Sequence, residues 1–162
     1  MKQSRMGKSQ AIQSKREEVA RLLVERVKEL SALHRAVRVM QDNVKPVSKV
    51  LSEIVSLIPP AWQYPEVTEA CLTVDGMRFS TSGFRKTPWT QRADFTTPDG
   101  RQGKLEVVYR EKRPPESEGP FLAEERNLIN SLADSCASYL TRRRAEEELL
   151  VAHGRLQALS KQ

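Results

Sequence analysis

A group of aromatic and basic residues between positions 62 and 89 is the set in this chain best suited to bind a small molecule. Small-molecule pockets are lined mainly by aromatic and apolar side chains, with a few fixed polar groups. Arg85 could pair with an anionic ligand through a bidentate contact. The candidate pocket residues are Trp62, Tyr64, Phe79, Phe84, Arg85 and Trp89. The alternative is that these rings fill a small second core beneath the loop over residues 83–90.

The chain offers little for catalysis or metal binding. Its two histidines, His34 and His153, fall within predicted helices and far from any nucleophile motif. Cys71 and Cys136 lie far apart in the sequence and show no metal-ligand spacing, so each is interpreted as a small apolar residue in a reducing compartment. No glycine-rich segment is placed to hold a phosphate. We therefore expect no catalytic residue, no metal site and no cofactor.

The formal charge of +6 comes mainly from two basic runs. One is the N-terminal tail, and the other is Arg142-Arg143-Arg144, which is followed closely by three glutamates. Neither run is interleaved with aromatic residues, so solvated faces are favoured over nucleic-acid binding. The N-terminus has no apolar signal segment, and no apolar run approaches the ~20 residues that span a bilayer. These features predict a cytoplasmic protein without a membrane span.

Two apolar stripes, one near each end of the chain, predict helices that pair with a second copy. Their residues are spaced alternately by three and four, which is the repeat of a coiled coil. The predicted dimer seam consists of Val19, Leu23, Leu30, Ala145, Leu149, Ala152, Leu156 and Leu159. Arg26 interrupts the first stripe, where a single charge can fix the register at a cost in stability. The alternative is packing on the chain's own domain, which we expect after Leu30 for Leu33, Val37, Met40 and Val44.

Between these helices the sequence predicts an amphipathic helix followed by an antiparallel sheet. Pro46 suits the first turn of the helix, and the proline pair 59–60 ends it. Alternating apolar residues then predict strands near 70–74, 78–82, 91–96 and 105–110. Asp75-Gly76 and the segment 97–100 supply the turns. A sheet with one apolar face, preceded and followed by helices, is typical of an α+β fold.

Four segments, in this order, resemble GAF-type sensory domains, and more narrowly the compact variety found in bacterial sensor histidine kinases and related signalling proteins. They are Leu-Ile-Pro-Pro-Ala-Trp-Gln-Tyr-Pro at 57–65, Phe-Arg-Lys-Thr-Pro-Trp at 84–89, Glu-Gly-Pro-Phe-Leu-Ala-Glu-Glu-Arg-Asn-Leu-Ile at 118–129 and Arg-Arg-Ala-Glu-Glu-Glu-Leu at 143–149. The resemblance runs from about Leu30 to Leu150. It implies a GAF-like sheet of about four or more strands, with the terminal helices on one face and a loop-lined pocket on the other. No cyclic-nucleotide motif or bilin-attachment cysteine is found, so the resemblance does not indicate which ligand this chain would bind.

The sequence and the resemblance together predict four parts. A disordered basic tail occupies 1–14, a coiled-coil helix 15–30, a GAF-like domain 31–142 and a signalling coiled coil 143–162. The resemblance implies a non-catalytic input module of a two-component-type pathway, which forms a homodimer and is joined to a kinase or cyclase output domain. A ligand-free dimerisation adaptor stays open as an alternative. A nucleic-acid-binding protein that uses its basic ends is less favoured.

Overall fold

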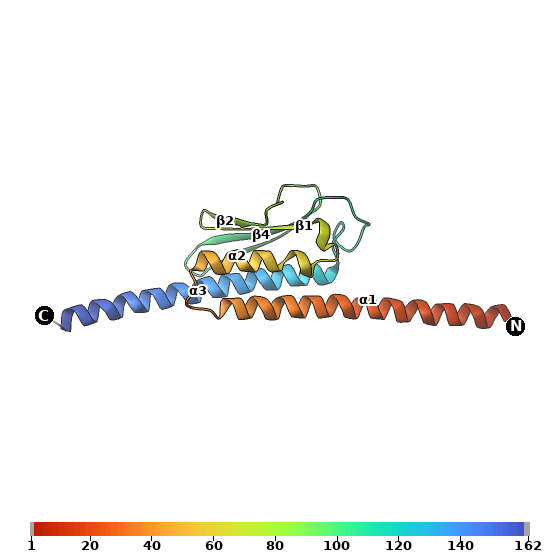
Figure 1. Ribbon diagram of the computed structural model, residues 1–162, viewed down its shortest axis with the longest axis horizontal. Helices are drawn as coiled ribbons and strands as arrows, with labels where there is room; N and C mark the ends of the chain where they lie inside the picture. The colour runs from red at the N-terminus through yellow and green to blue at the C-terminus, as the bar shows by residue number, and fades with distance from the viewer. Residues whose placement is uncertain (1, 161–162) are drawn as a thin grey trace.

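Residues 2–160 are described by the computed structural model, in which long helices precede and follow four strands (Figure 1). The helices are α1 (Lys2–Met40), α2 (Val47–Leu57) and α3 (Ala123–Ser160). The strands are β1 (Thr68–Val74), β2 (Met77–Ser80), β3 (Thr90–Thr96) and β4 (Gln102–Tyr109). Two short 3-10 turns, η1 (Pro59–Ala61) and η2 (Pro65–Val67), join α2 to β1. The predicted α+β class with long terminal helices is confirmed.

The four strands form one antiparallel sheet in the order β2-β1-β4-β3. Leu105 on β4 stands opposite Leu72 on β1 and Ala93 on β3, so apolar residues line up across one face. Asp75 and Gly76 close the β1–β2 hairpin with φ values of 52° and 78°. Both residues tolerate positive φ, which is why this dipeptide predicted the hairpin.

The helices form two further layers on one side of the sheet. Helix α2 packs on β1 and β2, helix α3 packs on β3 and β4, and α1 lies against α2 and α3 on their far side (Figure 1). The core between the sheet and α2 and α3 is fully buried. Its large side chains include Leu51, Ile54, Leu72, Leu105, Leu128 and Ile129.

Helices α1 and α3 lie side by side and run in the same direction (Figure 1). As a result, the start of α1 extends beyond the domain at one end, and the end of α3 extends beyond it at the other. We call residues 2–24 the N-terminal arm and residues 145–160 the C-terminal arm. The side chains described in the N-terminal arm are all exposed, and so are nearly all of those in the C-terminal arm.

The face that α1 turns toward the domain differs from the expected one. Contact begins at the buried Glu25 and Glu29 and continues through Ala32, Ala36 and Met40. Domain packing is confirmed for Met40 and the half-buried Leu33, but it is wrong for Val37 and Val44, which are 45% and 95% exposed. The small side chains of Ala32 and Ala36 let α1 approach its neighbours closely. The stripe that contains Leu30 and Val37 therefore stays free beside the domain.

The N-terminal tail also differs from its expectation. Residues 2–14 continue α1 as helix, where the sequence predicts disorder. No proline precedes Pro46, and most residues of this segment are compatible with a helix, so nothing in the sequence ends the helix before Met40. Met1 and residues 161–162, which belong to the predicted tail and coiled coil, lie outside the described residues.

Candidate functional site

The candidate pocket residues between 62 and 89 do not gather around one cavity. Trp62 is fully buried in the core, and its Nε1 donates a hydrogen bond to Gln91 Oε1 at 3.2 Å. Tyr64, Phe79 and Trp89 are partly buried and pack against the same core. The other two lie on the loop after β2, where Phe84 lies beneath the guanidinium of Arg78, 5.5 Å from its ring centre, and Arg85 donates to the carbonyl of Arg110.

The loop over residues 81–89 is tied to the strand ends. Thr81 Oγ1 donates to the carboxylate of Glu69, and Thr87 Oγ1 donates to the carbonyl of Tyr109 at 2.8 Å. Gly83 lies so close to Glu69 that an added Cβ would fall 2.5 Å from its Oε1. None of the six candidate residues lines any of five hollows on the surface of residues 2–160.

A buried carboxylate lies where α3 begins. Glu125 Oε1 accepts a hydrogen bond from the backbone N–H of Leu122 at 2.7 Å, and its Oε2 accepts from the N–H of Gln63 at 2.7 Å and from Tyr109 Oη at 3.3 Å. The side chain thus ties the first turn of α3 to the corner between η1 and η2. Burial raises its pKa to about 7, an effect that the nearby Glu25 increases and that the two N–H donors oppose.

We expect the pKa of Glu125 to make the folded protein less stable as pH rises. Between pH 4.5, the ordinary value, and about 7, the folded state holds a proton that the unfolded chain has lost. The free energy of unfolding should therefore fall by about 3 kcal/mol across this window. Urea unfolding at several pH values measures it, with Glu125→Gln as the non-titrating control. If the free energy of unfolding of E125Q fell equally with pH, the effect would come from other titrating groups.

The three consecutive arginines near the end of the domain all contact segments outside α3. Arg142 donates to the carbonyl of Met40, and Arg143 Nη1 donates to that of Asp42 at 3.3 Å. Arg144 Nη1 pairs with Asp99 Oδ2 at 3.1 Å. The run therefore ties α3 to the α1–α2 connection and to the β3–β4 turn, whereas the sequence was interpreted as a solvated face.

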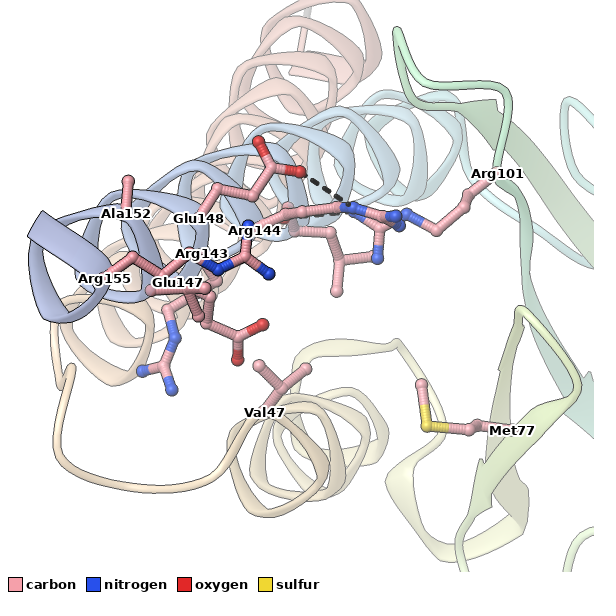
Figure 2. Close-up of a pocket in the computed structure, with 11 residues that line it drawn as sticks. Val47, Met77, Arg101, Arg143, Arg144, Glu147, Glu148, Ala152 and Arg155 are labelled. Carbon is pink, nitrogen blue, oxygen red and sulfur yellow. Dashed lines mark hydrogen bonds and ion pairs between the residues drawn. The ribbon is translucent and has the colours of Figure 1, made fainter. Parts of the chain in front are cut away.

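Next to this run lies a hollow of about 600 Å³ (Figure 2). One wall is the face of α3 that leaves the domain, and the other is formed by the start of α2, the β1–β2 hairpin and Arg101 (Figure 2). The lining residues are Val47, Met77, Arg101, Leu140, Arg143, Arg144, Glu147, Glu148, Val151, Ala152 and Arg155. The hollow thus combines an apolar surface with four guanidinium groups and two carboxylates.

Sequence reasoning missed this hollow because its walls come from residues as far apart as 47 and 155. Two signals were present, namely the arginine run and the turn over residues 97–100 that brings Asp99 to it. No local spacing shows that the two meet. The hollow therefore becomes visible only in the folded chain.

The predicted dimer seam is exposed along its whole length. Val19, Leu23 and Leu30 on α1 and Leu149, Leu156 and Leu159 on α3 are each at least half exposed, and Ala145 and Ala152 are exposed as well. Ile12 and Val37 extend the α1 stripe in both directions at the same spacing. A row of large apolar side chains in water is unfavourable, and exposed apolar patches are typical of surfaces that bind a partner.

The two histidines and the two cysteines lie in different surroundings. His34 and His153 are exposed on α1 and α3, and both cysteines are buried, with burial raising the pKa of the Cys136 thiol to about 12. No cluster of three or more His, Cys, Asp or Glu side chains is placed to hold a metal ion within residues 2–160. No helix in this range is long and apolar enough to cross a bilayer.

No family model, curated protein or solved structure matches the chain. The similarity to GAF-type domains therefore depends on the four sequence segments alone.

Proposed function

We propose that the chain is a non-catalytic, GAF-like regulatory module that works as a homodimer. The two copies pair along the seams of α1 and α3, and the C-terminal arms pass a change in the domain to a kinase or cyclase output. The observation that carries the proposal is the pair of bare apolar stripes on the arms. When a second copy covers these side chains, each Å² of apolar surface removed from water stabilises the dimer by roughly 25 cal/mol.

Two further features support this proposal. The parallel course of α1 and α3 sends the arms out at opposite ends of the domain, so that one arm can receive a change and the other can deliver it. Helix α3 is continuous from Glu125 to the C-terminal arm. A shift in its packing on the sheet is therefore carried along one rigid element, as coupling between distant sites requires.

A ligand-free dimerisation adaptor is the second candidate function. It is favoured by the placement of Trp62, Tyr64, Phe79 and Trp89 in or against the core rather than around a cavity. The two functions share the dimer and differ in whether a small molecule binds. A ligand that binds the folded state alone raises the melting temperature, whereas an adaptor shows no such rise.

We test the parallel dimer by cross-linking with single cysteines. In a parallel pair each seam residue meets its own copy, so Val19→Cys and Leu149→Cys should each form a disulfide-linked dimer on oxidation. Cα atoms must come within about 7 Å for this bond. Cys71 and Cys136 are buried and do not compete. The readout is a non-reducing gel, with reduction restoring the single chain.

The matched controls are Val24→Cys and Leu150→Cys, which are exposed on the same helices but lie off the seam. Both should cross-link far more slowly. Cross-linking at equal rates for seam and control positions would contradict the proposed seam. Cross-links that form only between a V19C chain and an L149C chain would show an antiparallel pair instead.

A further inference from the structure

The hollow beside the C-terminal arm contains an incomplete charge arrangement. Arg101 Nε and Arg144 Nη1 both pair with one carboxylate oxygen, Asp99 Oδ2, at 3.2 and 3.1 Å. The two guanidinium groups thus converge from the β3–β4 turn and from α3 (Figure 2). Asp99 offsets one of these two positive charges, and the carboxylates of Glu147 and Glu148 line the same hollow as the guanidinium groups of Arg143 and Arg155. Glu148 Oε1 lies 3.5 Å from Arg144 Nε, but its side chain is 73% exposed, so water weakens this pair.

Arg101 is held in place, and both guanidinium groups still have donors to spare. Arg101 is only 15% exposed, and its Nη2 donates to the carbonyl of Leu140 at 3.2 Å. Each guanidinium carries five N–H donors, and the contacts above use only some of them. Arg143 and Arg155 line the same hollow, and Arg143 also donates to the carbonyl of Asp42. A preorganised fork of this kind suits the oxygens of a phosphoryl group.

The rest of the hollow is apolar and suits a flat organic body. Val47, Met77, Leu140 and Val151 contribute its hydrophobic surface. Met77 comes from the exposed β1–β2 hairpin, where its sulfur can contact an aromatic ring favourably. A volume of about 600 Å³ falls within the usual range for small-molecule sites. A nucleotide requires hydrogen-bond donors for its phosphates beside an apolar surface for its base, and the hollow has both.

We propose that this hollow binds a nucleotide, with its phosphates on Arg101 and Arg144 and its base against Met77 and Val47. The ligand would touch both the domain and the start of the C-terminal arm. It would therefore hold the exit of α3 against the β1–β2 hairpin. The site goes beyond the proposed function, because it needs neither a second copy nor an output domain, and it shares only Ala152 with the predicted dimer seam.

The test is binding of ADP to the full chain, measured by calorimetry and thermal shift at constant ionic strength, because salt screens such contacts. Adenosine represents the base and ribose of ADP, and pyrophosphate represents its two phosphates. We expect ADP to raise the melting temperature, and adenosine to leave it unchanged. Pyrophosphate should bind at least tenfold more weakly than ADP, a difference of about 1.4 kcal/mol or more.

Two variants probe the two walls. Arg144→Gln should weaken ADP binding on the order of tenfold or more, since it removes a charged fork. Met77→Glu, on the opposite wall, should weaken it similarly, because it replaces the apolar contact to the base with a carboxylate. The matched control is Arg142→Gln, which has the same charge change two residues away on α3 but does not line the hollow. It should bind ADP as the unaltered chain does.

Three results would overturn the proposal. They are the absence of ADP binding at millimolar concentration, equal binding by R144Q and the unaltered chain, and pyrophosphate binding as tight as that of ADP. The last would leave a site for an inorganic anion only. The mass of each sample in solution is measured alongside. A monomer that binds ADP would contradict the proposed dimer but keep the site, and a dimer that does not bind ADP would do the reverse.

Discussion

Lysine at both Leu149 and Leu156 is expected to convert the dimer into a single chain of 18.4 kDa. Both side chains lie on the α3 seam, two turns apart, and are mostly exposed in one chain. In the proposed dimer they are buried against their copies, so the variant would bring four ammonium groups into one apolar interface. Like charges without partners in such a place are costly. We expect the dissociation constant to rise about 100-fold or more.

Sedimentation equilibrium over a range of concentrations measures this change. The matched control is Leu150→Lys with Gln157→Lys, which has the same spacing, but each substitution lies one residue, or about 100°, around the helix. Leu150 is 72% exposed, against 70% for Leu149, so exposure alone does not distinguish the two variants. The control should stay dimeric. If both variants kept the mass of the unaltered protein, the C-terminal arm would not be part of a dimer interface.

Alanine at Trp62 is expected to cost about 3–5 kcal/mol of folding free energy. The indole is fully buried, and its loss opens a cavity beneath the sheet. It also leaves Gln91 Oε1, in a side chain that is 1% exposed, without its donor. Urea unfolding measures the loss. The L149K/L156K background keeps the protein monomeric there, since association would otherwise change the apparent stability.

Two further variants separate the roles of the indole. Trp62→Phe keeps most of the ring but removes the N–H, so it should lose about 1–3 kcal/mol. Trp89→Ala removes a partly buried ring at the edge of the core and should cost less than Trp62→Ala. Equal losses for W62A and W89A would contradict the assignment of Trp62 to the core. Trp62 was a pocket candidate by sequence, and this comparison tests its structural role directly.

The elements of this fold could be predicted where one local pattern decides the outcome. Asp75-Gly76 fixes a hairpin, Pro46 begins a helix and the proline pair 59–60 ends it, because these residues restrict the backbone directly. The alternating apolar residues of β4 face the helices because a strand turns successive side chains to opposite faces. The strand ends at Val74 and Thr96 match the prediction, and the other six shifted by one to three residues, since pairing with a neighbour sets the ends as well.

The parts that could not be predicted depend on contacts between distant residues. The residue type of Trp62 is the same in a core and in a pocket wall, so sequence alone does not separate the two. The domain-facing side of α1 includes Ala32 and Ala36, whose small side chains give a weak apolar signal beside Leu30 and Val37. The pairing of Arg144 with Asp99 joins residues 45 positions apart, and no spacing rule indicates it.

The unbroken course of α3 has a mechanical consequence. A helix rises 1.5 Å per residue, so the 17 residues from Arg144 to Ser160 form a lever about 24 Å long. A tilt of about 5° at Arg144 would move its tip by about 2 Å, which is comparable to the helix shifts seen at switching interfaces. The contacts of Arg142, Arg143 and Arg144 hold the helix at this point, so the exposed part of α3 would pivot there. A small change in the tilt of α3 at these arginines therefore becomes a larger displacement at Ser160.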